Sequence, residues 1–275
     1  MSNQYSDGLT FWEHLEQLRV ILIRAAVVFG VCMVAAFMAM PYIFDRIILW
    51  PCDGSFPLYR LMDSGISSGW LSDLSASSDF HVSLVSMELT SQFFIHFSAA
   101  CWGGVLVAFP FLIYLFWGFI SPGLYPREKQ GARRAFFWGN LMFFTGVAVG
   151  YMVVFPIALR FLAEYRISQA VTPMISLDSY MDNFFTLIIL MGALFELPLV
   201  AWMLGRAGIL KRSFFKRYRR YAIFGIAVIA AGVTPTGDPF SMAAVFLPVY
   251  ALWEMSAHLV PKNEPAHDSS ETETP

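Results

Sequence analysis

The sequence predicts an all-α protein that crosses a membrane with six helices. Hydrophobic residues make up 57% of the 275 residues and charged residues 14%, whereas soluble domains average roughly 45–50% and about 25%. The apolar residues form long uncharged runs, and a helix needs about 20 such residues to span a bilayer. Basic residues gather between alternate runs, as they do in multi-pass membrane proteins.

Six runs with few or no charges define the expected transmembrane helices. The first run is not followed by the small-residue cleavage site of a signal peptide, so we expect a permanent helix. The last two runs are shorter, and short spans thin the bilayer or recruit neighbouring helices. We therefore expect a locally thin membrane beside them. The runs cover residues 25–44, 89–126, 135–159, 183–205, 221–237 and 239–253.

The distribution of basic residues predicts the orientation, because Lys and Arg concentrate in cytoplasmic connections. With the N-terminus in the cytoplasm, most of the 18 basic residues fall on the cytoplasmic side. The C-terminus then lies in the cytoplasm as well. The basic residues left on the outer side are Arg46, Arg60, Arg160 and Arg166.

The chain is expected to have three parts. Residues 1–18 form a cytoplasmic amphipathic segment, and residues 19–260 form the six-helix transmembrane domain. Residues 261–275 form a disordered cytoplasmic tail, because this acidic, Pro/Ser/Thr-containing segment has too little apolar surface to fold. The main connections are a long outer loop, 45–88, and two inner loops, 119–134 and 205–220.

Prolines recur inside the expected spans, at Pro110, Pro156, Pro198 and Pro248. Each removes one helical hydrogen bond and bends its helix, which neighbouring helices can accommodate. Several bends would curve the bundle into a concave, cupped wall. Adaptation to local packing explains any single proline equally well. The small residues of Gly146–Gly150 (GVAVG) suit a close contact between helices.

The sequence contains no motif of common catalytic chemistry. It has neither a G-x-x-x-x-G-K-[ST] phosphate loop nor an H-E-x-x-H zinc motif. Gly65–Gly69 (GISSG) matches G-x-S-x-G, but it lies in a loop of small residues and not between a strand and a helix. We therefore expect no enzyme, no catalytic residue, no metal and no cofactor. Any transport work must draw its energy from elsewhere.

Glu196, in the segment ALFELPLV, is the one acid deep in an apolar run. A charge near the bilayer centre costs roughly 2.5–3.5 kcal/mol on insertion scales. Such a residue faces a polar cavity, meets a partner or holds a proton. The alternative is a protonated glutamate that bonds to a neighbouring helix for packing alone. The nearby Pro198 frees backbone groups that also need partners, which favours the cavity.

Acidic residues also lie at the expected inner boundary of the membrane. Glu13, Glu16 and Gln17 precede the first span and occupy about a 100° arc of a helix. Glu128 follows the second span and lies among basic residues. These acids either form solvated salt bridges, worth under about 1 kcal/mol per pair, or present anions to a basic peptide. The basic neighbours of Glu128 are Arg127, Lys129, Arg133 and Arg134.

Two of these segments match longer patterns of a known family. The inner connection GFISPGLYPREK fits F-I-x-P-G-L-Y-x-x-E-K, and FWEHLEQLR is similar to F-W-x-H-L-x-E-L-R. With YMVVFPIALRFL, FELPLV, VTPTGDP and LPVYALWE in matching order, roughly residues 11–258 resemble the TatC family, the multispanning receptor of the twin-arginine protein translocase. Further positions that match the family are Pro110, Phe155, Pro156, Pro235, Asp238 and Glu254.

The resemblance implies a receptor and assembly platform that exports folded proteins across the inner membrane of a bacterium. The implied energy source is the proton-motive force. The implied partners are TatA-like and TatB-like single-span proteins, twin-arginine signal peptides, other copies of the chain and the lipid bilayer, without nucleic acid. Glu196 resembles the family's fourth-helix acid, which is implied to meet polar groups of the single-span partners.

One departure from the family concerns Gln17, where the family commonly has Glu in its signal-peptide site. Because Gln17 carries no charge, we expect Glu16 or Glu13 to supply the missing negative charge, with Glu128 as the second acid of the site. Pairing of Glu16 with Arg19 at i,i+3 is the alternative, and both can hold. The expected signal-peptide site comprises Glu13, Glu16, Gln17, Arg19, Phe119, Pro122, Tyr125 and Glu128.

A proton-coupled small-molecule transporter, with Glu196 as the coupling site, is the alternative function. Transporters of that class contain internal repeats with broken helices. Residues 20–160 and 180–258 show no clear repeat. An intramembrane enzyme is disfavoured because the expected spans contain no Ser/His, Asp/Asp or metal-like constellation.

Overall fold

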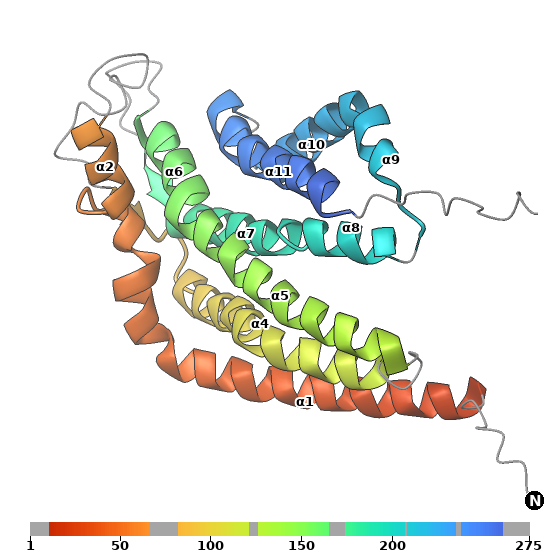
Figure 1. Cartoon of the computed structure of the whole chain (residues 1–275). Helices are drawn as coiled ribbons and strands as arrows, with labels where there is room; N and C mark the ends of the chain where they lie inside the picture. The colour runs from red at the N-terminus through yellow and green to blue at the C-terminus, as the bar shows by residue number, and fades with distance from the viewer. Residues whose placement is uncertain are drawn as a thin grey trace, which may run out of the picture.

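The computed structural model is a bundle of long helices, and it describes residues 11–65, 82–120, 126–164, 174–206, 208–234 and 238–260 (Figure 1). Within these ranges, 5 helical segments are long and apolar enough to cross a membrane. The protein is therefore an all-α, multi-pass membrane protein. These segments are Leu15–Cys52, Ser91–Gly118, Phe136–Ala163, Leu177–Arg206 and Pro239–Leu259.

The fifth expected span, residues 221–237, corresponds to α10 (Arg219–Val233), a helix of 15 residues that is not among these five segments. It would cover about 22 Å, against about 30 Å of hydrocarbon. Helix α11 (Pro239–Leu259) has 21 residues and would cover about 31 Å. The expectation that both last spans are short is therefore wrong for α11, whose helix continues beyond the uncharged run through Glu254. Crossing of the membrane by α10 stays a prediction.

The remaining elements connect the long helices. The expected outer loop contains α2 and the strand β1, which pairs in parallel with β2 through Leu84 to Ile175 and Val85 to Ser176. The other helices are α1 (Phe11–Ile43), α2 (Pro57–Gly65), α4 (Ser91–Ile120), α5 (Pro126–Val149), α6 (Phe155–Glu164), α7 (Leu177–Leu194), α8 (Leu197–Arg206) and α9 (Arg212–Arg217), with β1 at Leu84–Val85 and β2 at Ile175–Ser176.

Helices extend across two of the expected boundaries. Helix α1 runs unbroken through residues 18 and 19, so the amphipathic segment and the first span share one helix. Most of the expected inner loop 119–134 is helical, because α5 begins at Pro126, a residue favoured in the first helical position. The expected tail, 261–275, and most of the GISSG segment lie outside the described residues.

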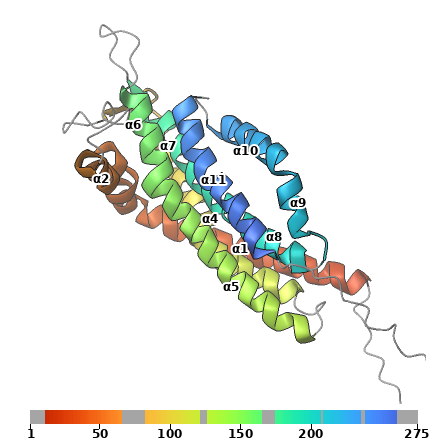
Figure 2. The same ribbon diagram turned by 45° about the horizontal axis from the view of Figure 1, so that its top comes forward.

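Glycines allow the long helices to approach each other closely. Helices α1 and α4 lie side by side (Figures 1 and 2), and a Cβ atom at Gly104 would come within 2.8 Å of the Cα atom of Met33. Between α5 and α7, a Cβ atom at Gly146 would lie 2.5 Å from the carbonyl oxygen of Met191. At Gly150 it would lie 3.1 Å from the Cα atom of Ile188. The close contact predicted for Gly146–Gly150 is confirmed.

The prolines have different local effects. Pro110 and Pro248 lie inside α4 and α11. Pro156 lies in α6 just after a π-helical stretch, Gly150–Val154, that joins α5 to α6 without a break, whereas Pro198 occupies the second position of α8 after a turn. A proline is tolerated in the first turn of a helix because its missing N–H would have no helical partner. Pro198 therefore marks the place where the fourth span is interrupted and restarted.

A fifth proline, Pro41, lies inside α1, where it leaves the carbonyl group of Phe37 without its usual donor four residues later. Helix α4 supplies a replacement, because Nε2 of His96 lies 3.0 Å from that carbonyl oxygen. Since a carbonyl only accepts, Nε2 must carry the proton. The two rings also stack, with centroids 4.1 Å apart. His96 thus links α4 to the position in α1 where Pro41 leaves a carbonyl group without a backbone donor.

Replacing His96 with Phe is expected to destabilise the protein by about 1–3 kcal/mol, because the carbonyl of Phe37 loses its donor while the ring contact is kept. Pro41→Ala restores a backbone N–H to that carbonyl. The cost of His96→Phe should therefore be smaller in the Pro41→Ala background. Thermal unfolding of the four proteins in detergent measures this difference, and equal costs in both backgrounds would contradict the assignment.

Candidate functional site

The two expected groups of signal-binding acids lie at the same end of the bundle. Helix α1 begins at Phe11 and carries Glu13 and Glu16 in its first two turns. Helix α5 begins at Pro126 and carries Glu128 in its first turn. Because α4 runs antiparallel beside α1, the start of α5 lies near the start of α1 (Figures 1 and 2). The fold thus brings together acids that are far apart in the sequence.

The described side chains of this region point largely into solvent. Glu16 and Arg19 are exposed, and Gln17 is half-buried. Among the described residues, Glu16 forms no ion pair, so the alternative pairing with Arg19 is not present. The carboxylate of Glu16 is accordingly available to a ligand. The side chains of Glu13, Phe119 and Glu128, and the whole of Pro122 and Tyr125, lie outside the described part of the chain.

Glu196 lies at the break between α7 and α8, in the turn that precedes Pro198. Its Oε1 atom is buried and has no hydrogen-bond partner among the described residues. Its carboxylate faces α5, where a Cβ atom at Gly139 would lie 3.1 Å from Oε2. The absence of a side chain at Gly139 therefore makes room for the acid. An unsatisfied buried oxygen of this kind is a ready acceptor for a donor from outside the chain.

Asn140, the residue after Gly139 on α5, was not singled out by the sequence. Its Oδ1 atom is also buried and lacks a hydrogen-bond partner among the described residues. A polar side chain in the uncharged run 135–159 is the signal that could have revealed it. Within the described ranges, no group of three or more His, Cys, Asp or Glu side chains could hold a metal ion.

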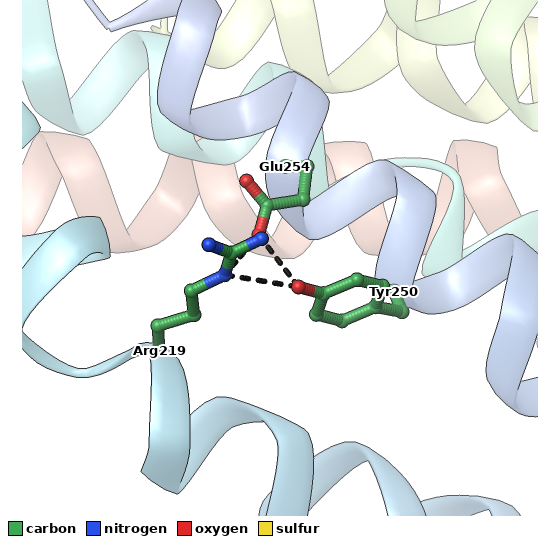
Figure 3. Close-up of polar contacts among 3 residues, drawn as sticks. All are labelled: Arg219, Tyr250 and Glu254. Atoms are coloured by element: carbon green, nitrogen blue, oxygen red, sulfur yellow. Dashed lines mark hydrogen bonds and ion pairs between the residues drawn. The ribbon is translucent and has the colours of Figure 1, made fainter.

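The acids near the last hairpin have local structural contacts. Asp238 caps α11 and accepts a hydrogen bond from the backbone N–H of Ser241 at 2.7 Å. Glu254 accepts a hydrogen bond from the hydroxyl of Tyr250 at 2.8 Å and lies 2.7 Å from Nε of Arg219. Arg219 also donates to the Tyr250 hydroxyl at 2.9 Å (Figure 3). The three side chains tie the start of α10 to the last turns of α11.

The other family-matching positions belong to the packing of the bundle. Phe155 is buried, and its ring lies edge-on to those of Tyr180 and Phe184, with centroids 5.2 Å and 5.0 Å away. Pro110 and Pro156 have the helical positions described above, and Pro235 lies outside the described residues. Arg219 and Tyr250 were missed as partners of Glu254. The i,i+4 spacing of Tyr250 and Glu254 was the available signal.

Comparisons with known proteins identify the family of the chain. A family model described as Sec-independent protein translocase protein (TatC) matches residues 13–248. TatC of Deinococcus radiodurans is 34% identical over 248 residues, which cover 90% of this chain and 84% of that protein. TatC of Koribacter versatilis is 34% identical over 271 residues, or 96% of this chain and 90% of that protein.

The fold is similar to solved structures as well. A crystal structure of the twin arginine translocase receptor TatC in DDM has a TM-score of 0.72 and 28% sequence identity, and the match covers 90% of this chain and 99% of that chain. A second crystal structure of that receptor has a TM-score of 0.69. These likenesses do not favour the small-molecule transporter. The chain belongs to the TatC family of Sec-independent protein translocase proteins, as a multi-pass membrane component of a bacterial translocase.

Proposed function

We propose that the chain is the signal-peptide receptor of its translocase and that it binds paired arginines with the acids at the starts of α1 and α5. The observation that carries the proposal is the exposed carboxylate of Glu16, which has no ion pair among the described residues. It lies at the end of the bundle where α5 starts, with Glu128 in its first turn. A guanidinium group binds a carboxylate through two parallel hydrogen bonds, which lysine cannot reproduce. Two acidic segments at one end suit two adjacent arginines.

The basic residues around these acids add selectivity. Arg19 and Arg134 are exposed near the starts of α1 and α5. They would repel cationic peptides whose arginines do not meet a carboxylate. Gln17, half-buried on α1, can add a neutral hydrogen bond. Phe119, Pro122 and Tyr125 complete the proposed site between α4 and α5.

Glu196 is proposed as the contact for TatA-like and TatB-like single-span partners. Its unsatisfied oxygen, together with that of Asn140, would accept hydrogen bonds from polar groups on a partner helix. Such a contact relieves the cost of burying an unpaired polar atom inside a membrane. In this arrangement both termini are cytoplasmic, the membrane is the bacterial inner membrane, several copies of the chain join one complex, and the proton-motive force supplies the energy.

Binding of signal peptides by the detergent-solubilised chain tests the receptor proposal. A peptide that carries Arg-Arg is expected to bind at least about tenfold more tightly than the same peptide with Lys-Lys, because charged hydrogen bonds contribute on the order of 1.5–3 kcal/mol each. Isothermal calorimetry measures both affinities. Equal affinities for the two peptides would contradict recognition by paired carboxylates.

A further inference from the structure

The segment between Glu196 and Asp238 contains no acidic residue. It contains seven basic residues, all within the connection from the end of α8 to the start of α10. Neither the proposed signal-peptide site nor the proposed partner contact uses this concentration of charge. We call these side chains the basic face. Its members are Arg206, Lys211, Arg212, Lys216, Arg217, Arg219 and Arg220.

Most charges of the basic face are exposed and not neutralised. Six of its seven residues are exposed, and Arg212 is half-buried. Among the described residues, Arg219 is the one member that forms an ion pair with a carboxylate. Arg212 contacts Nδ1 of His258 at 3.1 Å, which adds no negative charge. The basic face therefore presents strong positive potential to whatever lies beside it.

Exposed aromatic side chains lie between these charges. Phe214 and Tyr218 are each 40% exposed, and Tyr221 is 72% exposed. Aromatic residues concentrate where a membrane meets water, because one part of the ring is apolar and the other tolerates water. The next turns of α10 continue with exposed apolar side chains, Phe224 and Val228. The basic face thus borders an apolar surface of the kind that contacts lipid tails.

The rest of the protein holds the basic face in place. Phe215 of α9 is buried and its ring lies 4.8 Å from that of Trp253 on α11. Arg219 is bound to Tyr250 and Glu254 of the same helix (Figure 3). Helices α9 and α10 consequently lie along one side of α11 (Figure 2). The charges are therefore fixed at one end of the short apolar helix α10.

We propose that the basic face binds the headgroups of anionic phospholipids. Phosphate oxygens accept hydrogen bonds from Arg and Lys. Each basic residue near an anionic leaflet also strengthens the attraction between the protein and the membrane. Since α10 would cover about 22 Å of about 30 Å of hydrocarbon, headgroups must approach its ends. The exposed aromatic side chains favour lipids over an acidic protein, because a lipid contacts rings and charges together.

A matched pair of double variants tests the proposal in the purified full-length chain. R217Q/R220Q removes two charges of the basic face, and R46Q/R60Q removes two exposed arginines, one from the π-helix Phe44–Ile48 that follows α1 and one from α2. Binding of fluorescent phosphatidylglycerol and phosphatidylcholine is measured in neutral detergent. R217Q/R220Q should weaken phosphatidylglycerol binding by about tenfold or more, whereas R46Q/R60Q should leave it nearly unchanged.

The measured affinities distinguish a lipid site from a general charge effect and from a site for an acidic protein. Preference for phosphatidylglycerol over phosphatidylcholine, lost only in R217Q/R220Q, supports the proposal. Equal loss in both double variants would overturn it in favour of a general charge effect. Binding of a soluble acidic peptide without any lipid preference would overturn it in favour of a protein partner. Binding of the Arg-Arg peptide should persist in R217Q/R220Q, so the lipid and receptor proposals fail independently.

Discussion

Glu128→Gln is expected to weaken binding of an Arg-Arg signal peptide by about 10- to 100-fold. Glutamine keeps the size of the side chain but cannot form the charged, two-bond contact with a guanidinium. The lost contribution is on the order of 1.5–3 kcal/mol, and each 1.4 kcal/mol corresponds to about tenfold in affinity. Calorimetry with the detergent-solubilised variant measures the change.

Glu88→Gln is the matched control, because Glu88 is an exposed acid at the other end of α4. It should bind the peptide as the parent chain does. The double variant E13Q/E16Q should weaken binding as Glu128→Gln does. Adding Gln17→Glu to it should restore part of the affinity, since the charge returns to the same face of α1. Unchanged binding in both Glu128→Gln and E13Q/E16Q would reject the site.

Gly146→Val is expected to have the largest effect on stability, because α5 and α7 touch at this residue. A Cβ atom there would lie 2.5 Å from the carbonyl oxygen of Met191 and 2.7 Å from the Cβ atom of Phe195. A backbone carbonyl cannot change rotamer as a side chain can, so the two helices must separate. Overpacking of this kind costs about 1–3 kcal/mol, and occasionally more. A lower unfolding temperature in detergent is the measured result.

Gly30→Ala and Gly118→Ala are the controls for Gly146, because a Cβ atom at either position meets nothing within 4 Å. Both lie inside helices, where alanine is preferred over glycine by about 1 kcal/mol in water. They should leave stability unchanged or raise it. Gly146→Ala should lower it, though less than Gly146→Val. Equal unfolding temperatures for Gly30→Ala and Gly146→Ala would contradict the close contact.

The sequence alone determined the class of the protein and the positions of its main spans. Hydropathy depends on each segment by itself, so uncharged runs reveal membrane helices without knowledge of the fold. The same reasoning found Glu196, because an acid in an apolar run is visible at any position. It also identified Gly146–Gly150 as a contact surface, and the structure confirms this contact. The family resemblance followed from short motifs in matching order.

Only the tertiary structure decided which residues meet. His96 of α4 contacts the Phe37 carbonyl that Pro41 leaves without a backbone donor. Arg219 of α10 forms an ion pair with Glu254 of α11. Such contacts depend on how whole helices pack, and residue spacing along one chain segment carries no record of a neighbour that lies far away in sequence.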